Sequence, residues 1–162
     1  MLDSMDIVLR LTAATLVGGA IGLDRDLRGK PTGVRTMGIV ALGSALIVMA
    51  SQFPAYTVDQ AAASRVMQGI VTGIGFLGAG VILRNPSGGR IHGLTTAAAI
   101  WLTACMGAAC GAGAWFLVLT AAVLVTAIIA FGKRLERSFE RRFPHEDPDD
   151  EEAQEPLTPR PD

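Results

Sequence analysis

The stretch GIGFLGAGVILR, residues 73–84, and the segment HGLTTAAAIW, residues 92–101, decide the fold of this chain. Each is an apolar run with small residues spaced along it, and a polar turn separates them. In water this glycine content would oppose a helix, because Gly costs roughly 1 kcal/mol relative to Ala inside one. In a lipid bilayer, backbone groups must pair within their own segment, and small residues let two helices approach closely. The two segments therefore predict a tightly packed transmembrane hairpin.

Charged residues are confined to a few parts of the chain. Of its 162 residues, 50% are hydrophobic and 18% are charged, an average that a soluble domain could also show. Residues 37–58, 66–83 and 94–131, however, contain no Asp, Glu, Lys, Arg or His. About 20 mostly apolar residues are enough to cross a bilayer. We therefore expect an all-α membrane protein, a bundle of five transmembrane helices at residues 7–23, 34–53, 65–83, 93–112 and 115–131.

Basic residues in alternate loops predict the orientation of this bundle. Lys and Arg gather in the first and third loops and after the fifth span, and they are nearly absent from the second and fourth connections. Because cytoplasmic loops carry the excess of Lys and Arg, we expect the N-terminus outside and the C-terminus in the cytoplasm. Arg10, one turn inside the first span, is expected to snorkel outward.

The chain changes character after Phe131. Residues 132–143 place Leu135, Phe139 and Phe143 four residues apart among bases, which predicts a basic amphipathic helix on an anionic membrane surface. A simple extension of the fifth span explains this pattern nearly as well. Residues 144–162 are acidic and rich in Pro, cannot bury a core, and are expected to form a disordered tail.

Small residues predict where helices pack against each other. Gly18 and Gly22 in the first span, and Gly69 and Gly73 in the third, have the GxxxG spacing of close helix pairs. Chance is the alternative, since the chain contains 19 Gly. The residues expected to serve helix packing are Gly18, Gly22, Gly69, Gly73, Gly75, Gly78 and Gly80.

Catalytic and metal-binding motifs are missing from the sequence. Gly73, Gly75 and Gly78 match the spacing of a dinucleotide-binding loop, but that motif needs a preceding strand, and here it falls inside a predicted span. No Cys/His cluster has the spacing of metal ligands. We therefore expect no enzyme activity, no cofactor, no metal site and no nucleic-acid partner.

Polar residues gather where the first and third loops meet the predicted helices. Asp24 stands among bases such as Arg25 and Arg28, so this face suits an anion or a phospholipid head group better than Mg²⁺. The excess of bases in cytoplasmic loops explains them equally well without a ligand. As a hypothesis, Asp24 pairs with Arg84 or Arg90 and fixes the first hairpin against the second. The candidate cytoplasmic-face cluster consists of Asp24, Arg25, Lys30, Arg35, Thr36, Arg84, Arg90, His92, Thr95 and Thr96, and two further polar motif residues are Arg65 and Gln68.

The two polar turns are similar to each other. The order of Gly, Arg, Pro and a closing Gly–aliphatic–polar–Thr sequence in residues 22–36 returns loosely in residues 80–96. This similarity suggests a duplicated hairpin, which would bring both turns to one cytoplasmic site.

Three motifs in this order resemble the MgtC/SapB family of bacterial inner-membrane proteins. They are GLDRDLRGKPTGVRTMG at residues 22–38, GIGFLGAGVI at 73–82 and HGLTTAAAIW at 92–101, and the resemblance covers about residues 5–131. It implies a multi-pass protein of the bacterial inner membrane that serves magnesium homeostasis or adaptation to low Mg²⁺. For some members it implies regulation of other membrane proteins such as the F-type ATP synthase. A small-solute or ion (Mg²⁺) transporter, oligomeric with copies of itself, is the alternative.

This sequence also departs from the pattern of the family that it resembles. His92 stands where a base is frequent, Asp24 where Glu is common, and Met37 where His is common. Many members continue into a soluble ACT-like domain, whereas this chain has the acidic tail, so we expect a short form. Partners implied by the resemblance are the lipid bilayer and other membrane proteins.

Overall fold

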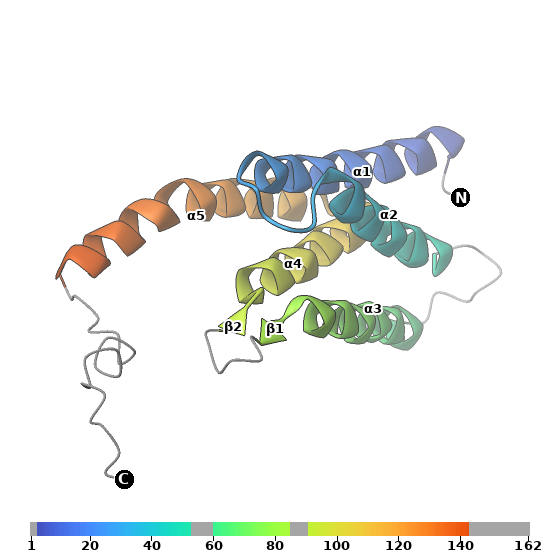
Figure 1. Ribbon diagram of the computed structural model, residues 1–162. Coiled ribbons are helices and arrows are strands. Elements are labelled where there is room, and N and C mark those ends of the chain that lie inside the picture. Colours follow the sequence, from blue (N-terminus) through green and yellow to red (C-terminus); the bar gives the residue numbers. More distant parts are fainter. Residues whose placement is uncertain (1–2, 53–59, 85–90, 143–162) are drawn as a thin grey trace, which may run out of the picture. The chain divides into compact units, whose positions relative to one another are not determined.

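The computed structural model describes residues 3–52, 60–84 and 91–142 of the chain (Figure 1). The described part contains five helices and one pair of two-residue strands. In chain order these elements are α1 (Ser4–Leu27), α2 (Val34–Ala50), α3 (Gln60–Val81), β1 (Leu83–Arg84), β2 (Ile91–His92), α4 (Leu94–Gly111) and α5 (Trp115–Arg142). The strands are antiparallel, with Leu83 opposite His92. Each of the five segments predicted from the sequence is helical, and the short strands were not predicted.

The helices differ from the predicted spans mainly at their ends. α1 continues through the charged residues up to Leu27, and α3 begins five residues earlier than expected. α5 is one helix from Trp115 to Arg142, so the fifth span and the basic segment after it share a single helix. The basic segment's position on a membrane surface stays a prediction, and residues 143–162 lie outside the described residues.

The contacts divide the chain into two units. Residues 1–121 form the first unit, which holds α1 to α4 and the start of α5, and the described part of the second unit is the remainder of α5.

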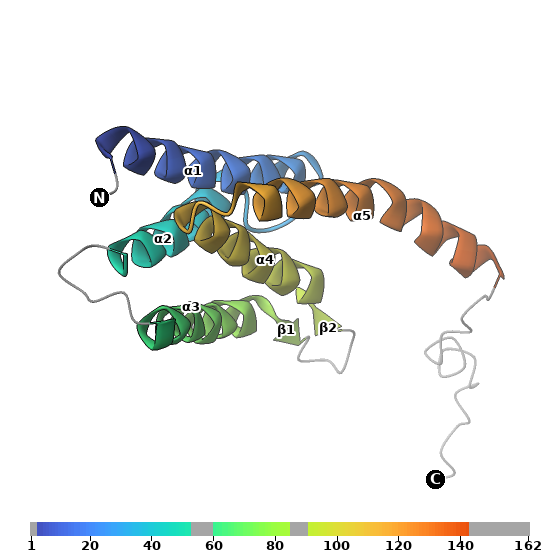
Figure 2. The same ribbon diagram turned by 180° about the vertical axis from the view of Figure 1, so that it is seen from behind.

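Helix α4 is the central helix of the first unit. It contacts α1, α2 and α3, and half of its length is buried, against 17% of the apolar part of α1. Figures 1 and 2 show α4 between α1 and α3, and α2 packs against both α1 and α4. The aliphatic core between α2, α3 and α4 consists of Met37, Val48, Ile70, Ile74, Ile100, Ala104 and Ala108.

Close approach of α4 to α2 depends on two glycines that are not among the predicted packing residues. A Cβ atom added at Gly107 would lie 2.6 Å from the Cα of Ala41, and one at Gly111 would lie 2.8 Å from the Cα of Ala45. Because each pair is four residues apart on its own helix, glycines of α4 face alanines of α2 over a full turn. This is the small-residue crossing typical of membrane helices.

The predicted packing glycines divide into two groups. Gly18 and Gly22 lie against α2, where a Cβ would come within 2.5 Å of the Met37 carbonyl oxygen and 2.6 Å of the Val34 Cα. Gly78 meets Ala97 at an ordinary 3.6 Å. A Cβ at Gly69, Gly73, Gly75 or Gly80 would meet no atom within 4 Å. These four therefore pack no helix of the described chain, because α3 turns Ile70 and Ile74 toward the core instead.

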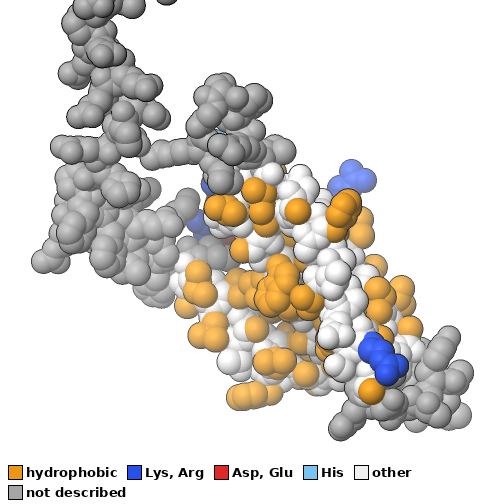
Figure 3. All heavy atoms as spheres, turned by 90° about the horizontal axis from the view of Figure 1, so that it is seen from below, with side chains coloured by type: hydrophobic (Ala, Val, Ile, Leu, Met, Phe, Trp, Pro, Cys, Tyr) orange, Lys and Arg blue, Asp and Glu red, His pale blue; other side chains and the backbone are white. Residues whose placement is uncertain are grey.

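Large hydrophobic side chains cover much of the outer surface. Leu16, Ile39, Phe76 and Phe116 are each more than two-thirds exposed, and the face seen in Figure 3 is largely hydrophobic, with its few Lys and Arg side chains near the edges. Such extended apolar surface is unfavourable in water and natural in lipid. α1 and α4 are long and apolar enough to cross a membrane, and α2 and the Trp115–Ile128 part of α5 are shorter apolar helices.

Candidate functional site

A buried arginine ties the first loop to the start of α4. Arg25, in the last turn of α1, is only 7% exposed. Its Nε donates a hydrogen bond to the Thr32 carbonyl oxygen at 3.2 Å, and its Nη2 donates to the Pro31 carbonyl oxygen at 2.8 Å. The same Nη2 lies 2.7 Å from Oγ1 of Thr96, in the first turn of α4. One guanidinium therefore joins the end of α1 and the loop that follows it to the start of α4, which is 71 residues away from Arg25 in the sequence.

The loop around this arginine is held by its own backbone and by Asp26. Oδ2 of Asp26 accepts a hydrogen bond from the Val34 backbone N–H at 3.0 Å, which satisfies one of the free donors at the start of α2. A Cβ at Gly33 would collide with this carboxylate. Thr32 has a φ of 63°, a left-handed conformation that is uncommon for Thr. Its carbonyl is the one that Arg25 Nε binds, so the arginine stabilises a strained turn.

The second polar turn ends at Gly93, directly before α4. Gly93 has a φ of 95°, and a Cβ there would collide with the Val81 carbonyl at the end of α3. Only glycine fits this close approach without strain. The turn thus packs the start of α4 against the end of α3 and presents Thr96 to Arg25.

The electrostatic surroundings of Arg25 are unusual. Arg25 lies between two helix ends of opposite partial charge: the last turn of α1, where a cation is favourable, and the first turn of α4, where a cation is unfavourable. Among the described residues no carboxylate lies within ion-pair distance of Arg25, whose hydrogen bonds go to neutral oxygens. Asp24 forms an ion pair with Arg28 at 2.9 Å on the exposed side of α1. The hypothesis that Asp24 also pairs with Arg84 or Arg90 stays a prediction, because those two side chains lie outside the described residues.

The other members of the candidate cluster lie at the surface or outside the described part. Arg25 and Thr96 are brought together and buried, and the duplication of the two hairpins stays a hypothesis. The backbone of Arg84 forms part of β1, but its side chain and all of Arg90 lie outside the described residues. The exposed members are Lys30, Arg35, Thr36, His92 and Thr95, and the motif residues Arg65 and Gln68 of α3 are exposed as well.

A second arginine, at the other end of α1, was not expected to take part in any site. Nη2 of Arg10 pairs with Asp6 at 2.9 Å, and its Nη1 donates to the carbonyl oxygen of Gly111 at 3.0 Å and to Oε1 of Gln52 at 3.4 Å. The guanidinium reaches back one turn to Asp6 and across to the last residue of α4, and the snorkelling of Arg10 toward the membrane surface stays a prediction. A cation is favourable there, since the C-terminal end of a helix carries partial negative charge. The signal in the sequence was a base inside an apolar span, which is costly unless it finds a partner.

The two arginines fasten α1 to both ends of α4. The same number of residues separates Arg10 from Arg25 on α1 as separates their partners Thr96 and Gly111 on α4. This equal spacing fixes one antiparallel register between the two helices.

We expect Arg10→Ala to lower the free energy of unfolding by about 1–3 kcal/mol, because the Gly111 carbonyl and the Asp6 carboxylate lose their shared donor. Thermal unfolding of the purified protein in detergent micelles measures this loss. The matched control is Arg28→Ala, which removes an exposed ion pair on the same helix and should cost no more than about 0.5 kcal/mol. Equal losses for the two variants would show that the Arg10 contacts contribute nothing particular.

These features define a class of protein: a helical membrane protein with a buried polar cluster, formed by Arg25, Pro31, Thr32 and Thr96, between its first loop and the start of α4. The chain belongs to the MgtC family, whose family model matches residues 11–138.

Curated relatives support this assignment. Protein SrpB of Synechococcus elongatus is 44% identical over 148 residues, which cover 83% of this chain and 79% of the relative. Protein SapB of Bacillus subtilis is 44% identical over 67% of this chain, and protein MgtC of Salmonella typhimurium is 40% identical over 73%. The chain spans about half the length of SapB and MgtC. No solved structure matches the chain significantly.

Proposed function

We propose that this protein is a multi-pass inner-membrane protein that serves magnesium homeostasis, or adaptation to low Mg²⁺, by regulating other membrane proteins. In this proposal all five helices cross the membrane, with the N-terminus outside and the C-terminus in the cytoplasm. The observation that supports the regulatory role is the chemical type of the buried polar side chains.

Those groups are poor ligands for a divalent cation. Among the described residues, the buried polar side chains are Arg25, Ser44, Thr96 and Thr103. Mg²⁺ is usually held by one or two carboxylates together with retained waters, whereas the best-defined buried site here presents a guanidinium. This contrast supports a protein that acts through contacts with partners. The exposed apolar helix faces are the surfaces available for such contacts, with another copy of the chain or with the F-type ATP synthase.

Transport remains the alternative function, and one relative favours it. The 37% identical protein YhiD of Escherichia coli is named a putative magnesium transporter, and the match covers 76% of this chain and 59% of YhiD. A path between subunits of an oligomer would allow transport without buried carboxylates in a single chain.

Growth of a deletion strain over a series of Mg²⁺ concentrations tests the magnesium role. We expect a growth defect confined to low Mg²⁺, rescued fully by the wild type and by the exposed-pair variant Arg28→Ala. Rescue by Thr96→Val should be incomplete, because that variant removes the acceptor that joins the first loop to α4. Growth equal to the parent strain at every concentration would contradict the magnesium role.

Two further measurements separate regulation from transport. Uptake of Mg²⁺ into proteoliposomes that contain an entrapped Mg²⁺-sensitive dye would favour the transporter. Co-purification of ATP synthase subunits with the wild-type protein, lost in a variant that also fails to rescue growth, would favour regulation.

A further inference from the structure

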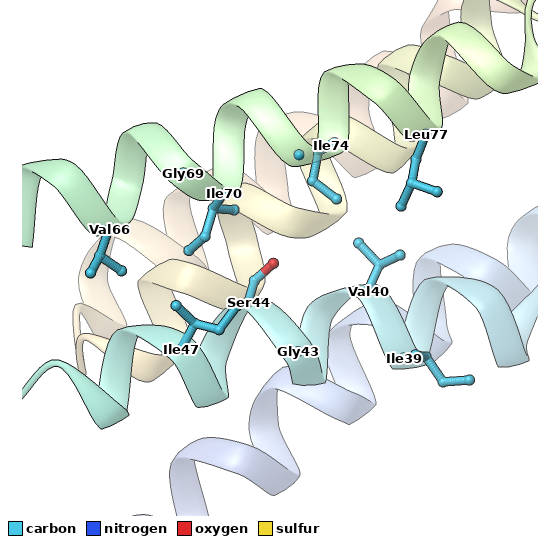
Figure 4. Close-up of a pocket in the computed structure, with 11 residues that line it drawn as sticks. Ile39, Val40, Gly43, Ser44, Ile47, Val66, Gly69, Ile70, Ile74 and Leu77 are labelled. Carbon is cyan, nitrogen blue, oxygen red and sulfur yellow. The ribbon is translucent and has the colours of Figure 1, made fainter.

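An open apolar groove runs between α2 and α3. The two helices barely touch each other, although both pack near α4. The groove has a volume of about 460 Å³ and is lined by five residues of α2 from Ile39 to Ile47 and six of α3 from Val66 to Leu77. Figure 4 shows aliphatic side chains from both helices pointing into it, with Ser44 as the one hydroxyl among them.

Glycines create this groove. Gly43, Gly69 and Gly73 line it, and a Cβ atom at any of the three would meet nothing within 4 Å. The GxxxG spacing of Gly69 and Gly73, which predicts helix packing, therefore leaves open space. That space lies within the roughly 300–1,000 Å³ range of small-molecule sites.

The dimensions of the groove fit one lipid chain. From Val66 to Leu77, α3 rises by about 17 Å at 1.5 Å per residue. The hydrocarbon core of a bilayer is about 30 Å thick, so the groove is about as long as one leaflet is deep. Its lining carries no charged residue, which excludes a charged occupant along its length.

A polar anchor stands at one end of the groove. Arg65 is exposed, directly precedes Val66, and lies one helical turn before Gly69, so it is a neighbour of the groove on the surface of α3. Gln68 is exposed in the same turn. The planar guanidinium of Arg suits phosphate oxygens. A lipid phosphate would neutralise this exposed guanidinium, whereas the lining of the groove offers no carboxylate through which a second copy could pair with it, so charge favours a lipid phosphate.

We propose that the α2–α3 groove binds one acyl chain of a membrane phospholipid whose phosphate is held by Arg65, with Gln68 beside it. This site gives a role to Arg65 and Gln68, two motif residues that take no part in the buried polar cluster around Arg25. It depends on α2 and α3 lying in a bilayer and is independent of any role in magnesium homeostasis.

Native mass spectrometry of the full chain, with phosphatidylglycerol added to the detergent-solubilised protein, tests this site. We expect the wild type to retain one tightly bound lipid and Gly73→Leu to lose it, because the new side chain fills the groove. Gly69→Leu fills the same groove one turn away and serves as the second filling variant. The matched control is Gly75→Leu. Gly75 lies on the same helix and also in open space, but it does not line the groove, so this variant should retain the lipid. Circular dichroism and thermal unfolding identify the variants that remain folded.

A separate variant tests the contact between Arg65 and the lipid head group. Arg65→Ala should weaken phosphatidylglycerol binding about tenfold while leaving diacylglycerol, which has no phosphate, unchanged. Equal lipid retention by both folded filling variants and the wild type would overturn the proposal. A wild-type dimer that both filling variants convert to monomer, with lipid binding unchanged, would show that a second copy occupies the groove, and would also overturn it.

Discussion

Replacing Gly107 by alanine is expected to lower the free energy of unfolding by about 3 kcal/mol, the upper end of the usual range for overpacked interiors. The added methyl group would lie 2.6 Å from the Ala41 Cα and would also collide with the Ala41 carbonyl oxygen. Both obstacles are backbone atoms of α2, so no side-chain rotation can make room. The two helices would have to move apart and lose their contact along the whole crossing.

The loss should extend to the neighbouring turn. Gly111 faces Ala45 in the same way that Gly107 faces Ala41, with its Cβ position 2.5 Å from the Ala45 carbonyl oxygen. Because both glycines depend on one helix separation, their effects should not add: Gly107→Ala/Gly111→Ala should cost less than the sum of the single variants. Additive losses would show that each contact relaxes independently.

Unfolding of the purified protein in mixed micelles with increasing denaturing detergent measures these differences. Gly75→Ala is the matched control, since it makes the same chemical change in the interior of α3 where the new Cβ meets nothing within 4 Å. It should be neutral or slightly stabilising, because Ala is the better helix former. A Gly107→Ala protein as stable as Gly75→Ala would mean that α2 and α4 are not in close contact.

The positions of the helices could be predicted from the sequence, but not all of their ends. Long uncharged segments locate the apolar part of each helix because charge is excluded from hydrocarbon. They do not mark where the helix stops: α1 continues over Asp24 and Arg25, and α3 starts within a polar segment rich in alanine. Helix formation there depends on local propensity and capping, which hydropathy does not record.

The sequence shows where the glycines are, but it does not show which of them pack against another helix. GxxxG spacing occurs at Gly18, at Gly69 and at Gly107, and the first and last of these lie against α2, whereas Gly69 opens onto a groove. Spacing states only that small residues share one side of a helix. Whether another helix lies there depends on how α3 is rotated, and that rotation is set by the burial of Ile70 and Ile74.

The candidate site was predicted in its location but not in its contacts. The sequence placed the first loop and the start of α4 on one face, and the structure joins them through Arg25 and Thr96. It could not show which base is buried, because Arg25 and Arg28 differ only in the side of α1 on which they lie. That side is decided by the packing of α1 on α4.

Arg25→Ala is expected to lower the free energy of unfolding by about 3–5 kcal/mol. Hydrogen bonds from charged donors contribute about 1.5–3 kcal/mol each, and a buried acceptor left without a donor carries a further penalty. Three oxygens accept from this guanidinium: the hydroxyl of Thr96, the carbonyl of Thr32, and the carbonyl of Pro31, which also accepts from the Thr32 hydroxyl. Removing the side chain also leaves a cavity at a site that is 93% buried.

A lysine at position 25 should recover less than half of the free energy of unfolding that Arg25→Ala loses. Arg25→Lys keeps the positive charge but replaces a planar fork by a single ammonium group, which cannot reach from the strained turn at Thr32 to the first turn of α4 with the same geometry. Full recovery by Arg25→Lys would show that charge alone matters at this position. Unfolding in mixed micelles gives the comparison, with Arg28→Ala as the exposed-arginine control.

A double-mutant cycle isolates the contact that joins the two turns. Thr96→Val preserves the shape of the side chain and removes only the hydroxyl that accepts from Nη2 of Arg25. Alone, it should cost about 1–2 kcal/mol. Combined with Arg25→Ala, it should cost almost nothing further, which gives a coupling of about 1–2 kcal/mol between the residues. A coupling near zero would mean that the first loop is held by its own carbonyl contacts and that α4 is positioned independently, by its crossing with α2 and by Arg10 at its other end.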